Sequence, residues 1–153
     1  MTTFSSKSWT TNSAEETVQV GRELAAMLLP PKLLILRGDL GAGKTTLVKG
    51  LAEELTEIAG DEVTSPTFTL VHEYVNPGLK SETRGTRIFH LDLYRLQQER
   101  ELDVLGIDEM RREETIVLVE WGEKFASIVA QADGEIAIEH GGGDERTITL
   151  RLA

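Results

Sequence analysis

Cysteine is absent from the 153 residues, which excludes disulfide bonds, zinc–thiolate sites and a nucleophilic thiol and suits a reducing compartment. Long apolar runs are also lacking. The longest, "PPKLLIL", contains a lysine and falls far short of the roughly 20 residues that cross a bilayer. The first residues, "MTTFSSKSWTTNS", lack the apolar core of a secretory signal. We therefore expect a soluble, cytoplasmic protein with no membrane partner.

Positive charge is scarce as well. Sixteen basic residues stand against 26 acidic ones, which gives a formal net charge of −10. Most of such a surface repels a phosphate backbone, so the composition argues against extensive direct contact with nucleic acid and leaves room only for a local basic patch. No group of histidines and carboxylates has the spacing of a zinc site. The length predicts one domain that spans residues 1–153.

The first half of the chain alternates between helical and strand patterns. Residues 10–28 are expected to form a helix behind a short strand, with Ser13 as the helix cap. The run "LLILRG" is typical of a strand buried on both faces. Apolar residues from Leu47 to Ala59 recur at helical spacing, and Gly60 is the expected end of that helix.

The second half predicts further strands. "TFTLVHEYV" and "TRIFHLDLYRL" are expected to pair in antiparallel fashion, with Phe89, Leu91 and Leu93 on the core face. Short helices are expected over residues 97–112 and 122–132, a buried strand at "TIVLVE", and a terminal hairpin from "EIAIEH" and "TITLRLA". Together the patterns predict an α/β fold, a single P-loop NTPase domain in which antiparallel strands extend a central parallel sheet and helices cover both faces.

A glycine-rich loop lies between the first buried strand and the helix that follows it. Gly38, Gly43, Lys44 and Thr45 match the phosphate-loop pattern G-x-x-x-x-G-K-[ST]. Glycines let successive amide groups turn toward a phosphate, the lysine adds a charge beside the β- and γ-phosphates, and the threonine hydroxyl is a ligand for Mg²⁺. The loop predicts nucleotide binding by the whole stretch of Gly38, Asp39, Leu40, Gly41, Ala42, Gly43, Lys44, Thr45 and Thr46.

Two acids are candidates for the Mg²⁺ shell that such a loop requires. Glu120 follows four apolar residues, so it emerges at the carboxyl end of a buried strand, where ligands of open sheets bind. Asp92 lies on the face of its strand that also carries His90 and Tyr94. Either acid could instead be a solvated strand residue. We expect both to lie near Mg²⁺ or the attacking water, and His90 is the one histidine with neighbours that suggest a site.

The base is harder to predict from motifs. The guanine-reading tetrapeptide N-K-x-D is absent, and "DVLG" at residues 103–106 follows no apolar strand, so ATP is favoured over GTP. Trp121 could stack on the base, contact a partner, or pack as a core or rim residue.

Five segments of the chain come in an order and at spacings that resemble the bacterial tRNA threonylcarbamoyladenosine biosynthesis ATPases, the TsaE or YjeE family. These segments are "GDLGAGKTTL", "SPTFTLVHEY", "FHLDLYRL", "LGIDE" and "LVEW". The resemblance runs from about Thr17 to Arg146. It implies a small Mg²⁺-dependent ATPase with slow intrinsic turnover that assists a complex of TsaB-like and TsaD-like proteins. Contact with tRNA would be only indirect, through that complex.

The resemblance also implies roles for single residues. Lys44 and Thr45 match the phosphate-loop lysine and the magnesium-binding threonine, Glu120 the magnesium-associated glutamate, and Asp92 an active-site aspartate. Ser65 and Thr67 fall in a switch-like segment near the γ-phosphate. The two remaining matches lie near the nucleotide and are Thr17 and Arg146. Two alternatives stay open, a small-molecule kinase with the same loop and a nucleotide-gated binding module without enzymatic activity.

Overall fold

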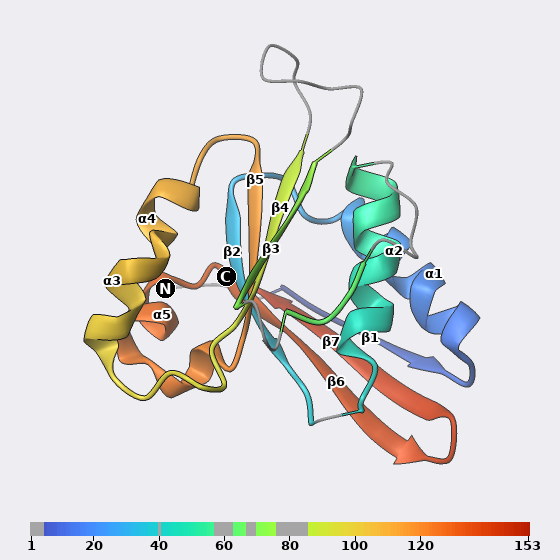
Figure 1. Ribbon diagram of the computed structural model, residues 1–153. Helices are drawn as coiled ribbons and strands as arrows, with labels where there is room; N and C mark the ends of the chain where they lie inside the picture. The colour runs from blue at the N-terminus through green and yellow to red at the C-terminus, as the bar shows by residue number, and fades with distance from the viewer. Residues whose placement is uncertain (1–4, 40, 57–62, 67–69, 76–85) are drawn as a thin grey trace.

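The described residues of the protein fold around a seven-stranded sheet with helices on both of its faces (Figure 1). The structure is a computed structural model, and it describes residues 5–39, 41–56, 63–66, 70–75 and 86–153. Leu40 and Thr67, both predicted to lie at a nucleotide site, and Gly60, the predicted end of a helix, fall outside these residues. Within the described ranges, no helix has the length and apolar character needed to cross a bilayer.

The sheet has a parallel centre and antiparallel edges. Its strands run in the order β1-β7-β6-β2-β5-β4-β3. β6, β2, β5 and β4 are parallel neighbours, whereas β1 and β7 extend one side and β3 the other in antiparallel pairing. This arrangement confirms the predicted α/β fold. The bounds are β1 (Ser5–Thr11), β2 (Lys32–Arg37), β3 (Val71–Val75), β4 (Arg87–Asp92), β5 (Thr115–Glu120), β6 (Gly134–Gly142) and β7 (Glu145–Leu152).

Helices of different length cover the two faces (Figure 1). On one face lie α1 (Ala14–Ala25) and α2 (Lys44–Thr56), which pack against each other. The other face carries short elements: η2 (Glu99–Glu101), α3 (Leu102–Leu105), α4 (Ile107–Met110), η3 (Gly122–Lys124) and α5 (Ala126–Gln131). Each layer of helices encloses its own apolar cluster, and β5, buried at all six positions, lies between the two clusters. The central strands are thus shielded on both faces.

The start of α1 differs from the prediction by a few residues. Ser13 caps the helix as expected, because its hydroxyl accepts the backbone N–H of Glu16 at 3.1 Å. Thr10 and Thr11, however, belong to β1, where they pair with Thr147 and Arg146 of β7. Pairing with a distant strand extended the backbone of two residues that local periodicity assigned to the helix.

The prediction for β4 was right about one face and missed the other. Leu91 and Leu93 of the expected core face are fully buried, and Phe89 packs against the same apolar cluster. Ile88 and His90 on the opposite face, which was not expected to face the core, are fully buried as well. The reason is that β4 lies inside the sheet between β3 and β5. Because helices cover both of its faces there, alternation along the strand does not distinguish an inner from an outer side.

Candidate nucleotide-binding site

The phosphate-loop sequence joins the carboxyl end of β2 to the first residue of α2, as predicted. Gly41 and Gly43 have φ angles of 80° and 108°, a region that side chains disfavour. A Cβ atom at Gly38 would lie 2.9 Å from the carbonyl oxygen of Ile138, which leaves no room for a side chain. The helix begins at Lys44, so its unpaired N–H groups and the positive end of its dipole point into the loop, where an anion binds favourably.

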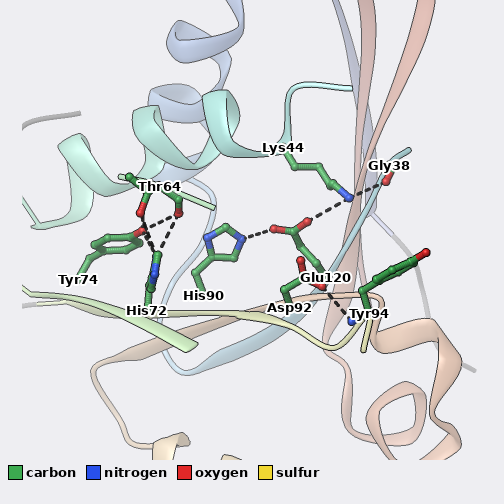
Figure 2. Close-up of polar contacts among 9 residues, drawn as sticks. All are labelled: Gly38, Lys44, Thr64, His72, Tyr74, His90, Asp92, Tyr94 and Glu120. Carbon is green, nitrogen blue, oxygen red and sulfur yellow. Dashed lines mark hydrogen bonds and ion pairs between the residues drawn. The ribbon is translucent and has the colours of Figure 1, made fainter. Parts of the chain in front are cut away.

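Lys44 lies at the centre of the candidate site. Its Nζ donates to the carbonyl oxygen of Gly38 at 2.7 Å and pairs with Oε1 of Glu120 at 3.0 Å (Figure 2). The same ammonium lies 5.4 Å from the centroid of the Trp121 ring, within the range of a cation–π contact. Only 9% of Lys44 is exposed. The charge is therefore held in a fixed place, between a carbonyl, a carboxylate and an aromatic face.

Glu120 is a buried carboxylate with two strong partners. It ends β5, is 4% exposed, and accepts a hydrogen bond at Oε2 from Nε2 of His90 at 2.6 Å. Burial by itself would raise the pKa of this carboxyl, but the hydrogen bond from His90 and the ammonium of Lys44 outweigh that effect and lower the pKa below its ordinary value. Glu120 is therefore ionised at neutral pH.

Asp92 lies beside Glu120. The two residues end the neighbouring parallel strands β4 and β5 and are partners in the register of the sheet. Asp92 is 4% exposed, and its Oδ1 accepts the backbone N–H of Tyr94 at 2.9 Å. Both acids line a cavity of about 690 Å³ together with Lys44 and Thr45. The fold thus brings together the acids that were predicted from two separate strands.

The donors in this cavity suit a hard cation. Thr45 offers a hydroxyl, and Asp92 and Glu120 offer carboxylate oxygens. No group of three or more histidine, cysteine, aspartate or glutamate residues that could enclose a metal occurs in the described part of the chain. Mg²⁺ needs no such cage, since it keeps several waters and binds through one or two carboxylates and the phosphates of its substrate. The residues present therefore fit Mg²⁺ bound together with a nucleotide.

A smaller hollow of about 120 Å³ lies on another side of the loop. Thr17 of α1 and Arg146 of β7 both line it, beside Ala42, Thr46 and Asp144. Arg146 donates from Nε to the carbonyl oxygen of Ala42 at 2.8 Å. The two residues that the resemblance placed near the nucleotide thus meet at the phosphate loop, although they come from opposite ends of the chain. Their roles stay predictions.

Trp121 has two of the surroundings that the sequence left open for it, the apolar core and the candidate site. It is partly buried against the apolar cluster on the α5 side of the sheet, and it lines the 690 Å³ cavity. Its backbone is left-handed, with φ of 63°, and its ring lies 5.2 Å from that of Tyr94, centroid to centroid. Trp121 therefore faces the Lys44 side of the loop. Ser65, from the predicted switch-like segment, lines the same cavity.

Sequence reasoning gave too little weight to two histidines. His90 binds Glu120 directly, and the only sequence signal for it was its place on the same strand face as Asp92. His140 of β6 contacts the carbonyl oxygen of Gly41 through Nε2 at 3.1 Å, which no motif indicated. Together with Arg146, His140 ties the β6–β7 hairpin to the phosphate loop.

Comparisons with known proteins found relatives of this chain. The family model for threonylcarbamoyl adenosine biosynthesis protein TsaE matches residues 11–148. The tRNA threonylcarbamoyladenosine biosynthesis protein TsaE of Bacillus subtilis is 41% identical over 144 residues, which cover 93% of this chain and 83% of that protein. Its counterpart of the same name from Haemophilus influenzae is 37% identical over 138 residues, 87% of this chain and 81% of that protein. The crystal structure of Bacillus subtilis YdiB superposes with a TM-score of 0.69 at 33% identity, over 99% of this chain and 88% of that one. The chain belongs to the TsaE family.

Proposed function

We propose that this protein is a Mg²⁺-dependent ATPase, built as a single P-loop domain, that acts in the biosynthesis of threonylcarbamoyladenosine in tRNA. The names of its relatives support the pathway. The meeting of Lys44, Glu120 and Asp92 in one cavity at the phosphate loop supports the ATPase activity. A binding module would need the loop, but it would not need two buried acids beside the place of the γ-phosphate.

Each residue would contribute by position and charge. The loop amides and the start of α2 would hold the phosphates. Lys44 would exchange its contacts with Gly38 and Glu120 for phosphate oxygens, since its ammonium already lies at the loop. Thr45 and Glu120 would hold the metal, and Asp92 would orient the attacking water. Mg²⁺, when bound, neutralises charge on the β- and γ-phosphates. No covalent intermediate with the protein is needed.

The base would be adenine, held on the side of the loop where Thr17 and Arg146 line the smaller hollow. The guanine-reading motif is absent from the sequence. Trp121, which faces Lys44 instead, would lie over the phosphates and be placed to meet a partner. Ser65 and the neighbouring Thr67 would respond to the γ-phosphate as a switch.

Slow intrinsic turnover is part of the proposal. Among the described residues that line the cavity, Lys44 is the one cation, and a second positive charge on the γ-phosphate accelerates such reactions by several orders of magnitude. We propose that TsaB-like and TsaD-like proteins stimulate the reaction and that tRNA is met only through them. The net charge of −10 supports this indirect contact.

Phosphate release from ATP, measured with and without the TsaB-like and TsaD-like partners, tests the proposal. We expect slow release that needs Mg²⁺ and rises when the partners are added. Transfer of the phosphate to a metabolite would support the small-molecule kinase instead. No release under any of these conditions would leave only the nucleotide-gated binding module.

A further inference from the structure

His90 occupies a place in the fold where a histidine is unexpected. It lies inside β4, paired in register with His72 of β3 and Leu118 of β5, and it is fully buried. The strand face that carries it also carries Ile88, which belongs to the apolar cluster beneath α1 and α2. The reaction steps proposed above assign it nothing to do.

Among the described residues, the ring of His90 makes one polar contact, and through it the two oxygens of the Glu120 carboxylate have different partners. Nε2 of His90 lies 2.6 Å from Oε2, whereas Oε1 lies 3.0 Å from Nζ of Lys44 (Figure 2). A carboxylate that pairs with two donors from opposite sides cannot rotate about its last bond without breaking both contacts. The contacts with His90 and Lys44 together thus fix the plane of the Glu120 carboxylate, with one oxygen turned toward Lys44 of the phosphate loop.

The other ring nitrogen shows that packing alone does not explain this histidine. Nδ1 of His90 is buried and has no hydrogen-bond partner among the described residues. Burying a polar atom without a partner is unfavourable, and an apolar side chain at this position would avoid that penalty. The contact with Glu120 is therefore the interaction that favours a histidine over an apolar residue at this position. The contact also requires an N–H at Nε2, because that nitrogen must donate to the carboxylate.

We propose that His90 is a positioning residue that holds Glu120 in the rotamer needed for Mg²⁺ and nucleotide. The inference rests on the proposed role of Glu120 and adds a residue that touches neither metal nor phosphate. Partners of metal-binding carboxylates act in this way, and their loss lowers metal affinity or activity by about 10- to 100-fold. Without His90, Oε2 would be buried with no donor, and Glu120 would turn away from the loop or toward Lys44.

Three variants of β4 test the proposal through the requirement for Mg²⁺. His90→Leu removes the donor, and His90→Gln keeps an N–H near the place of Nε2. Ile88→Val perturbs the same buried strand face without reaching Glu120. For His90→Leu we expect the Mg²⁺ concentration at half-maximal phosphate release to rise about 10- to 100-fold. We expect His90→Gln to restore most of that loss and Ile88→Val to match the wild type.

A binding measurement separates positioning from general damage. In His90→Leu, the affinity for ADP in the presence of Mg²⁺ should fall, while the affinity for ADP in EDTA should stay within about twofold of the wild type. An equal fall in both affinities, or a fall in Ile88→Val of the same size, would show a structural role and overturn the proposal. If His90→Leu does not fold, His90→Asn, whose shorter amide cannot reach Glu120, takes its place.

The double variant His90→Leu with Glu120→Ala tests whether the effect passes through Glu120. If it does, the double variant is no slower than Glu120→Ala alone, because residues that act as one unit are not additive. Additive losses would overturn the proposal. Should the wild type hydrolyse no ATP, the proposed function fails, and the two ADP affinities then decide on His90 by themselves.

Discussion

The contact between α1 and α2 leads to a prediction that does not depend on the catalytic proposal. A Cβ atom at Gly50 of α2 would lie 2.9 Å from the carbonyl carbon of Val18 and 3.0 Å from the backbone nitrogen of Arg22, and closer still to the carbonyl oxygen of Val18. All three atoms belong to the backbone of α1, so the clash cannot be relieved by the rotation of a side chain. Gly50→Ala therefore forces the two helices apart.

The size of the effect follows from two opposing terms. Overpacking that moves a helix costs about 3 kcal/mol, the upper part of the usual range, because the fully buried Leu47 and Leu51 must move with α2. Alanine recovers about 1 kcal/mol through its higher helix propensity. The net loss of about 2 kcal/mol lowers the melting temperature of a domain of this length by about 4 to 8 °C.

Thermal and urea unfolding of Gly50→Ala measure this loss. The matched control is Glu54→Ala, an exposed position of the same helix, which should change the free energy of unfolding by less than about 0.5 kcal/mol. If Gly50→Ala is as stable as the wild type or more stable, the helices are not in the close contact described, and helix propensity dominates instead.

Three further predictions concern the site. Because the pKa of the Glu120 carboxyl is lowered in the folded protein, its ionised form stabilises the fold above the unfolded-state pKa of about 4.3, and this contribution is lost as the pH falls through the folded value. In urea unfolding, the advantage of the wild type over Glu120→Gln should thus stay constant above about pH 5 and shrink as the pH falls below about 4. An advantage that grows as the pH falls would contradict the ion pair. Trp9→Phe leaves Trp121 as the only tryptophan. The fluorescence of Trp121 should then change when ADP binds, and it should stay constant in a protein that also carries Lys44→Ala. An unaltered response to ADP in that second protein would refute the placement of Trp121 beside Lys44 at the nucleotide site. Arg146→Ala should weaken ADP binding roughly tenfold, the effect of one charge-assisted hydrogen bond, whereas the control Arg151→Ala on the same strand should leave ADP binding unchanged. If isothermal calorimetry gives the two variants equal affinities for ADP, Arg146 does not belong to the site.

Local patterns were sufficient to predict the framework of the site. The apolar run before the phosphate loop is β2, the helix after it begins at Lys44, and Glu120 ends a strand that is buried throughout. Each of these features depends on neighbours in sequence: a continuous apolar run, a glycine pattern, and an acid directly after four apolar residues. The order of the elements then fixed the α/β fold, since parallel strands need crossovers and the helices supply them.

Features that depend on strand register could not be predicted in the same way. Asp92 lies beside Glu120 because β4 and β5 are neighbours in one particular register. In the same register, His90, two residues before Asp92 on β4, reaches the Glu120 carboxylate. A shift of one residue would turn all these side chains to the opposite face. The order of the strands also brings the β6–β7 hairpin to the phosphate loop, where His140 and Arg146 bind its carbonyls.

The rate of phosphate release by Glu120→Ala, in saturating ATP and Mg²⁺, tests the central claim most directly. Circular dichroism and thermal unfolding establish that the variant is folded. If Glu120 organises the metal beside Lys44, turnover should fall by about 100-fold or more, the loss usually seen when one group that stabilises transition-state charge is removed. Turnover equal to that of the wild type in the folded variant would contradict the assignment of this cavity as the site of ATP hydrolysis.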